Sequence, residues 1–132
     1  MQQFEVRTDS RSQMLNITTQ VQRTVDGADV AQGMVTVFVP HTTAGITINE
    51  NADPDVVHDM LEQLDQMVPW RQPFYQHGEG NSAAHVKASM MGSSVTVLIE
   101  RGQLVLGTWQ GIYLCEFDGP RTRKVAVTVT KH

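Results

Sequence analysis

Alternating apolar and polar positions predict short β-strands over most of the chain. In residues 2–7, Phe4 and Val6 alternate with polar neighbours. Successive side chains of a strand point to opposite faces of the sheet, so this alternation is typical of a strand with one buried face. Alternation or a run of β-branched residues predicts further strands at residues 14–18, 34–39, 45–48, 94–99, 103–106, 109–117 and 123–129.

Apolar spacing and end signals predict two or three helices. Asp53 and Pro54 begin the clearest one, because aspartate is a preferred N-cap and proline fits the first helical position. Apolar residues then recur at helical spacing, with Met60 and Met67 expected in the core, until Pro69 ends the helix. Two shorter helices are expected at residues 19–25, ending near Gly27, and at residues 83–91, ending at Gly92.

These elements predict a single α+β domain covering residues 1–132. Seven or eight strands would form mainly antiparallel pairs joined by short turns, with the helices packed against them. A long irregular connection is expected at residues 68–80, which contain the sequence PWRQPFYQHGEG. Connections of this length within a compact domain are often functional.

Composition and charge exclude several classes of protein. The chain carries a net charge of -4, whereas a nucleic-acid-binding protein needs a basic face to neutralise phosphate. No run of 18 apolar residues predicts a transmembrane helix, and the N-terminus lacks the basic start and apolar core of a signal peptide. We therefore expect a cytoplasmic protein. Cys115, the single cysteine, lies in the apolar run IYLCEF, which favours a buried structural thiol over a nucleophile.

The first group of candidate functional residues lies in the segment HGEGNSAAHVKASMMG, residues 77–92. On one straight helix, His77 and His85 would be about 12 Å apart. A chain that bends at the glycines before the helix can instead bring the two imidazoles together. Imidazole is a common ligand for zinc and related metals, although this spacing matches no standard zinc signature. The alternative is that His85 is a hydrogen-bonded interface residue.

Helical spacing assigns faces within the same segment. Asn81 and His85 are four residues apart and would share one helix face. Val86 and Met90 are expected on a neighbouring buried face, and the Lys87 ammonium can bind a phosphate.

The second group flanks the predicted strand at residues 45–48. His41 and Thr42 precede this strand, and Asn49 and Glu50 follow it. Strand ends commonly carry functional side chains. The alternative is that the threonines and asparagines of this group form turns and caps.

The third group begins at Trp109 and Gln110 and continues to Glu116, Arg121 and Arg123. Paired arginines suit a carboxylate or phosphate ligand. A cross-strand ion pair with Glu116 or Asp118 is the alternative. Trp109 can stack on a flat ligand or pack at a subunit interface.

Three segments together resemble the YjbQ-like family: PHTTAGITINENADPD, HGEGNSAAHVKASMMG and GTWQGIYLCEFDGPRTRKV. Members of this family are often labelled secondary thiamine-phosphate synthases. The resemblance implies a small α+β fold with a β-sandwich-like core, assembled as a homotrimer with a polar site near subunit boundaries. It marks these residues as functional: His41, Thr42, Asn49, Glu50, His77, Asn81, His85, Trp109, Gln110, Glu116 and Arg121.

The resemblance implies an enzyme acting on a phosphorylated or heterocyclic small molecule. The labelled activity joins a hydroxymethylpyrimidine diphosphate to a thiazole phosphate and expels pyrophosphate, which requires a cation or metal at the leaving group. We expect His41, His77 and His85 to bind a divalent metal, zinc or magnesium, or to act as acid–base groups with Glu50. The remaining marked residues, together with Lys87, would bind substrate. The alternatives are a non-enzymatic metal- or ligand-binding homotrimer and purely structural polar clusters.

Overall fold

A five-stranded antiparallel sheet forms one wall of the molecule. A computed structural model describes all residues, 1–132. The strand order in this sheet is β1-β8-β3-β5-β6. Its strands span β1 Gln2–Arg7, β3 Gln32–Phe38, β5 Ser94–Glu100, β6 Gln103–Leu104 and β8 Thr122–Lys131.

A three-stranded antiparallel sheet, in the order β2-β7-β4, forms the second wall. Its strands span β2 Gln13–Asn16, β4 Ala44–Glu50 and β7 Gln110–Glu116. In its register Ala44 lies opposite Glu116, and Glu50 lies opposite Gln110. The two ends of this ladder therefore carry different sets of candidate functional residues.

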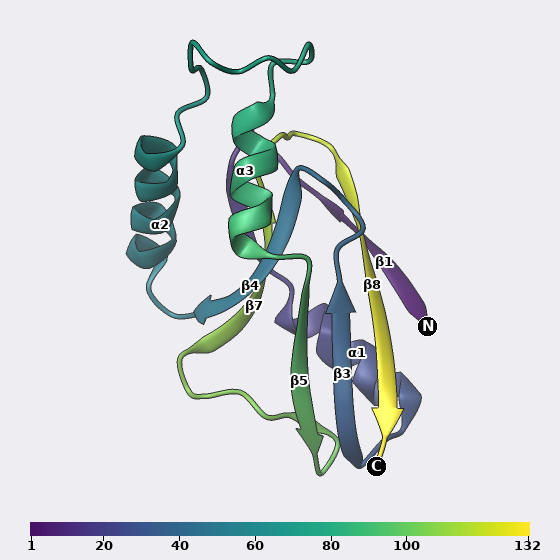
Figure 1. Ribbon diagram of the computed structural model, residues 1–132. Helices are drawn as coiled ribbons and strands as arrows, with labels where there is room; N and C mark the ends of the chain where they lie inside the picture. Colours follow the sequence, from purple (N-terminus) through teal and green to yellow (C-terminus); the bar gives the residue numbers. More distant parts are fainter.

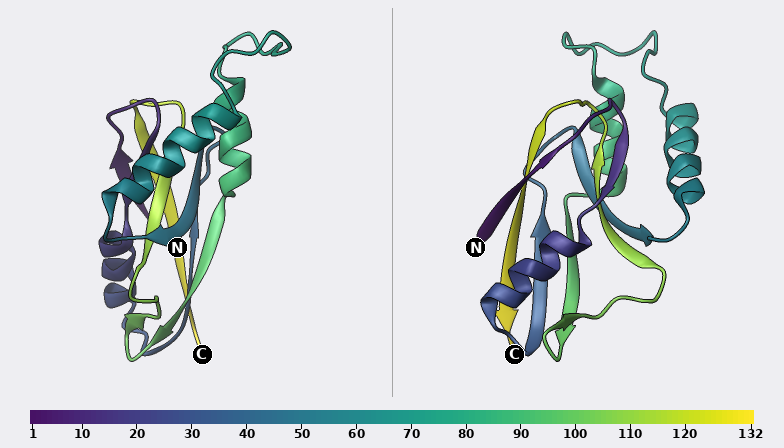
Figure 2. Two further views of the ribbon diagram at one scale, coloured as in Figure 1. Left: turned by 90° about the vertical axis from the view of Figure 1, so that its left-hand side faces the viewer. Right: turned by 180° about the vertical axis from the view of Figure 1, so that it is seen from behind.

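The main hydrophobic core lies between the two sheets and helix α1, Thr18–Ala28. Val21 and Val25 of α1 are fully buried against valines of β3 and β8, and the inward side chains of β4 and β7 complete the cluster. Figure 1 and Figure 2 show α1 against one face of the five-stranded sheet, while no helix covers its other face. This leaves one face of that sheet exposed.

Helices α2, Pro54–Met67, and α3, Ser82–Met91, cover the other side of the three-stranded sheet. A second cluster joins them there, made of Met14, Leu64, Ala84, Ala88, Tyr113, Cys115 and Phe117. Figure 1 shows the connection between α2 and α3 projecting beyond the body of the molecule. None of the three helices combines the length and apolar character that a membrane span requires.

The predicted α+β class and the predicted elements are confirmed: eight strands, three helices and an irregular segment after α2. Asp53 caps α2 as expected, since its Oδ1 accepts the Asp55 N–H at 2.9 Å. Cys115 is buried, and burial raises the pKa of its thiol to about 12. The buried structural thiol is therefore confirmed.

Three side chains differ from the sequence prediction. Met67, expected in the core, is 55% exposed, because Leu64 is the buried residue of the last turns of α2. Val86 and Met90 were expected to be buried, but each is more than two-fifths exposed. The small alanines of α3 form its buried face instead, which lets the helix approach β4 closely.

Candidate functional site

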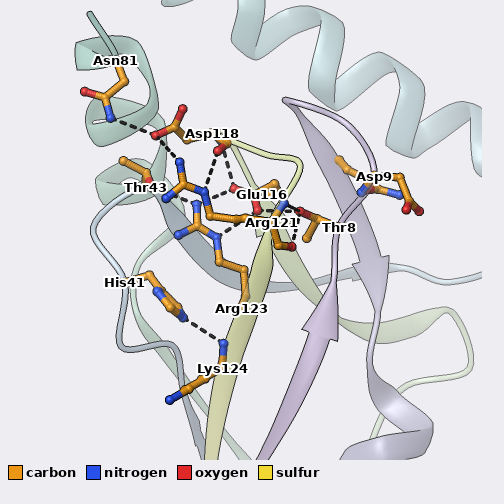
Figure 3. A network of polar contacts seen from close by, with 11 residues as sticks. Thr8, Asp9, His41, Thr43, Asn81, Glu116, Asp118, Arg121, Arg123 and Lys124 are labelled. Atoms are coloured by element: carbon orange, nitrogen blue, oxygen red, sulfur yellow. Dashed lines mark hydrogen bonds and ion pairs between the residues drawn. The ribbon is translucent and has the colours of Figure 1, made fainter. Parts of the chain in front are cut away.

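A buried ion pair anchors the end of the β7–β8 connection (Figure 3). Arg123 donates through Nε to Glu116 Oε1 at 2.9 Å and through Nη2 to Glu116 Oε2. Thr8 Oγ1 also donates to Glu116 Oε1 at 2.8 Å, and the Asp118 N–H donates to Oε2 at 2.9 Å. Arg123 Nη2 reaches Thr43 Oγ1 at 2.8 Å. The network thus ties β1, β7 and β8 to the loop that precedes β4.

The environment of Glu116 favours its ionised form. Burial alone would raise the pKa of this carboxyl group, but the hydrogen bonds from Arg123, the Asp118 N–H and Thr8 outweigh that effect and lower the pKa. Both oxygens are occupied within the network, and the side chain is fully buried. Glu116 therefore supports the site rather than lining it, and the cross-strand ion pair that the sequence left open is confirmed.

A second polar chain joins the same connection to the start of α3 (Figure 3). Arg121 donates through Nε to the Asp118 carbonyl at 2.9 Å and through Nη2 to Asp118 Oδ2 at 3.2 Å. Asn81 Nδ2 donates to the same Oδ2 at 2.8 Å. The other amide atom, Asn81 Oδ1, is buried and has no hydrogen-bond partner. A buried acceptor without a partner is costly in a folded protein and is often explained by a ligand, an ion or a water.

The glycine turn before α3 brings two imidazoles together. The rings of His77 and His85 lie with centroids 5.4 Å apart and planes at 88°. Gly80 takes φ +74° in this turn, and its N–H donates to the His77 carbonyl at 3.0 Å. A residue with a side chain rarely adopts this backbone conformation. The predicted convergence of the two histidines is confirmed.

His41 is held at the edge of the network by the backbone of β8. The Lys124 N–H donates to His41 Nε2 at 2.9 Å (Figure 3). The ring is partly buried, and burial together with the Arg123 charge lowers the pKa of the imidazole. Neutral imidazole is therefore favoured at this position.

An open cavity of about 460 Å³ lies between the loop before β4 and α3. It brings residues of the first and second sequence groups together within one chain. Two imidazoles and three hydroxyl groups dominate its polar lining. The lining residues are His41, Thr42, Ala44, His85, Ala88, Ser89, Gly92 and Ser93.

Lys87 lies on the opposite side of α3 from this cavity. Its side chain is almost fully buried, and Nζ donates to Asp65 Oδ1 of α2 at 3.3 Å. Two residues apart on a helix, His85 and Lys87 face different directions. Lys87 therefore joins α3 to α2, and we do not include it in the anion-binding part of the site.

The remaining predicted residues gather at the far end of the β4–β7 ladder. Ala44 and Glu50 are six positions apart on β4, a distance of about 20 Å. An open cavity of about 390 Å³ lies there, lined by Glu50, Ala52, Asp53, Pro54 and Trp109. Trp109 is 64% exposed at its rim.

Local hydrogen bonds hold the polar side chains at this far end. Glu50 Oε2 accepts the Ala52 N–H at 3.0 Å, and Asn49 Oδ1 accepts the Glu50 N–H at 2.7 Å. Gln110 Oε1 accepts the Gly107 N–H at 2.8 Å. The single predicted site is therefore divided, within one chain, between two ends of the ladder.

Three residues that the sequence did not single out as site residues belong to the cavity or its support. Ser89 and Ser93 line the cavity, and Asp118 links Asn81 to Arg121. Ser89 lies four residues after His85, so helical spacing offered a signal for it. Asp118 was predicted only as a possible ion-pair partner of the arginines, and its contact with Asn81 depends on the tertiary fold. The local sequence carries no comparable signal for Ser93.

The chain is similar to known proteins over almost its whole length. The family described as UPF0047 protein YjbQ-like matches residues 2–132. UPF0047 protein YugU of Bacillus subtilis is 52% identical over 120 residues, 91% of each chain. A UPF0047 protein of Methanocaldococcus jannaschii is 45% identical over 126 residues, 96% of this chain and 91% of the relative.

Solved structures agree with the fold. A crystal structure of an uncharacterized conserved protein from Clostridium acetobutylicum, of the yjbq/upf0047 family, superposes with a TM-score of 0.96 and 55% identity, covering 98% of this chain and 100% of that one. A conserved hypothetical protein from Thermus thermophilus gives a TM-score of 0.92 at 42% identity, with coverage of 98% and 100%.

Proposed function

Since the chain belongs to the YjbQ-like UPF0047 protein family, we propose that it is a small-molecule enzyme whose site is the imidazole-lined cavity beside α3. Its substrate would be phosphorylated or heterocyclic, and the reaction a pyrophosphate-displacing transfer like that of secondary thiamine-phosphate synthases. The convergence of His77 with His85 carries this proposal; His85 lines the cavity, and His77 lies next to His85 without lining the cavity.

The paired imidazoles have a spacing that suits a shared divalent metal. Two imidazoles on one tetrahedral zinc have ring centroids about 5.2 Å apart, given zinc–nitrogen distances of about 2.0–2.1 Å. The rings of His77 and His85 are 5.4 Å apart. Asn81 Oδ1, which is buried and unpaired, is on the helix face of His85 and offers an oxygen ligand.

His41 is not included among the proposed ligands. Its Nε2 already accepts the Lys124 N–H, so that nitrogen has no lone pair for a metal. No three His, Cys, Asp or Glu side chains of the chain come together as a metal-binding group. The proposed set is therefore His77, His85 and Asn81, with the metal's remaining positions left for substrate or water.

The position of each group suggests its role in the proposed reaction. When bound, the metal would supply the positive charge that stabilises a departing pyrophosphate. The Arg121 guanidinium, half-exposed and aligned by Asp118, would bind another anionic group of the substrate. Glu50 as proton acceptor and Trp109 as stacking residue lie at the far end of the ladder, so they would reach the cavity only from a neighbouring subunit.

Elemental analysis of the purified protein tests the metal, after exhaustive dialysis and beside His77→Ala and His85→Ala. We expect about one transition metal per chain in the parent and its loss in both variants, because each removes one of only two imidazole ligands. His58→Ala is the matched control, since His58 is exposed on α2 and should leave the metal content unchanged.

A parent protein that holds no metal even after supplementation would contradict the metal site and leave the histidines as acid–base or structural groups. Unchanged turnover of a phosphorylated substrate in both His77→Ala and His85→Ala would contradict the enzyme assignment.

The alternative is a non-enzymatic metal- or ligand-binding homotrimer. The observation that favours assembly is the uncovered face of the five-stranded sheet, whose central outward positions carry no charge. They are Met34, Thr36, Phe38, Ser94, Thr96, Leu98, Ala126, Thr128 and Thr130. An uncharged surface that exposes large apolar side chains such as Phe38 and Leu98 is typical of a protein interface. Consumption of a substrate over many turnovers distinguishes the enzyme from a protein that only binds.

A further inference from the structure

The hydrogen bond to His41 defines which ring nitrogen carries the proton. Nε2 is an acceptor, because the Lys124 backbone N–H points to it at 2.9 Å. An imidazole whose Nε2 accepts a hydrogen bond is neutral and carries its proton on Nδ1. The backbone of β8 therefore selects one tautomer of His41.

The Nδ1–H group of His41 is free to act on a ligand. It has no hydrogen-bond partner within the chain, and it is not among the buried polar atoms that lack one. The residue lines the cavity beside α3, where the hydroxyl groups of Thr42, Ser89 and Ser93 also lie. The Ser89 hydroxyl already donates to the His85 carbonyl at 3.0 Å, so the free donors around this open space are His41, Thr42 and Ser93.

Of the cationic side chains around His41, only Lys124 is without a carboxylate partner. Arg123 and Arg121 lower the pKa of the imidazole and Glu116 raises it, and each arginine is paired with a carboxylate, Arg123 with Glu116 and Arg121 with Asp118. The Lys124 side chain is exposed on the same strand and forms no ion pair. A cavity lined by uncharged donors, with an unpaired ammonium on the adjoining strand, suits an oxyanion.

We propose that this cavity contains an oxyanion-binding subsite, in which neutral His41 donates from Nδ1 to a phosphate or carboxylate oxygen of the ligand. Thr42 and Ser93 supply further donors. The subsite deepens the proposed function, since it assigns the anionic group of the substrate to a definite place. It changes the expected role of His41 from metal ligand to hydrogen-bond donor.

Two variants of His41 separate its two ring nitrogens. In His41→Gln the side-chain oxygen can still accept the Lys124 N–H, but no donor replaces Nδ1–H. In His41→Asn the amide can replace the donor at Nδ1, while the contact with Lys124 is lost. We expect inorganic phosphate to bind about tenfold or more weakly to His41→Gln, the effect of losing one hydrogen bond to a charged acceptor, and to retain more affinity for His41→Asn.

Nuclear magnetic resonance of the full chain, labelled with nitrogen-15 at histidine, is the test. We expect the His41 proton on Nδ1 near neutral pH, and a saturable shift of this ring on titration with phosphate. Parallel titration with acetate assigns the ligand class: tighter acetate binding indicates a carboxylate, and tighter phosphate binding indicates a phosphate ester. His132→Gln is the control, because the exposed C-terminal residue lies away from the cavity.

Repeating the phosphate titration after a chelator has removed the metal distinguishes the oxyanion-binding subsite from the proposed enzyme activity. If phosphate still shifts the His41 resonances after metal removal, and the protein turns over no substrate, the subsite is supported and the proposed function is not. A proton on Nε2, no response to either anion, or equal phosphate affinity in His41→Gln and the parent would overturn the subsite.

Discussion

At the scale of single residues, the buried carboxylate of Glu116 stays charged because its hydrogen-bond partners stabilise it. It is fully buried, and Arg123, Thr8 and the Asp118 N–H all donate to it. Removing one member of a buried pair leaves the other charge without compensation. Glu116→Gln should therefore lower the free energy of unfolding by about 3–5 kcal/mol, measured by urea denaturation at pH 7.

The destabilisation caused by Glu116→Gln should become smaller at low pH. The pKa of Glu116 in the folded chain lies below its ordinary value of 4.5, because the hydrogen bonds outweigh burial. Its stabilising contribution is therefore fully present above about pH 4.5 and is lost as the pH falls through the folded value. The stability difference between the parent and Glu116→Gln should narrow on acidification. Glu100→Gln, at an exposed end of β5, is the control, and an equal loss there would contradict this account.

At the scale of elements, the close approach of α3 to β4 shapes the cavity. A Cβ atom on Gly45 would lie 2.8 Å from the Gly92 carbonyl oxygen, 3.0 Å from Met91 Cβ and 3.1 Å from the Ala88 carbonyl oxygen. Backbone atoms at these distances cannot move without shifting the helix. Gly45→Ala should therefore destabilise the protein by about 1–3 kcal/mol, measured by denaturant unfolding monitored by circular dichroism.

Gly27 provides the matched comparison for Gly45. It lies in the last turn of α1, and a Cβ atom there would meet nothing within 4 Å. Alanine is a better helix former than glycine, so Gly27→Ala should be neutral or stabilise the protein by up to about 1 kcal/mol. If the two variants had the same effect on stability, the packing of α3 on β4 would not be the cause.

Elements were more predictable from the sequence than the site was. Asp53 and Pro54 gave the start of α2 because capping is local chemistry, and the valine alternation of β8 is likewise visible within a few residues. The pairing of His77 with His85 was accessible too, through the glycine turn between them. Each of these signals acts over fewer than ten residues.

The division of the site depends on contacts that are distant in the sequence. His41 meets Lys124 across 83 residues, and the Asn81–Asp118 hydrogen bond spans 37. Strand register decides such contacts, and it places Glu50 and His41 at opposite ends of one ladder. Lys87 illustrates the same limit, because its partner Asp65 becomes available only when α2 packs beside α3.

At the scale of the whole molecule, the two faces of the five-stranded sheet differ in what covers them. α1 covers one face, and the other presents Thr36, Thr96 and Thr128 in one row, with Leu98 in the next. Leu98 is 61% exposed, so a large apolar side chain lies on this uncharged surface. In the proposed homotrimer this face would be buried between subunits, which accounts for the absence of charge at its centre.

A charge placed at the centre of this face tests the assembly. Thr96→Arg should convert a particle of three times the 14.7 kDa chain mass into a single chain, because an unpaired charge is costly to bury in an interface. Light scattering after size-exclusion chromatography measures the mass, and circular dichroism checks the fold. Thr19→Arg, at an exposed position of α1, adds the same charge elsewhere and should leave the mass unchanged.

The mass and turnover of Thr96→Arg also test whether the two ends of the ladder act together across subunits. Glu50 and Trp109 can act with His41 and His85 only if subunits bring the two ends of the ladder together. A Thr96→Arg monomer that keeps its fold should therefore retain phosphate binding at His41 but lose turnover. A parent protein with the mass of a single chain, or a Thr96→Arg variant with the trimer mass, would contradict this assembly. Full turnover by the monomeric variant would instead place all catalytic groups at the His41 end.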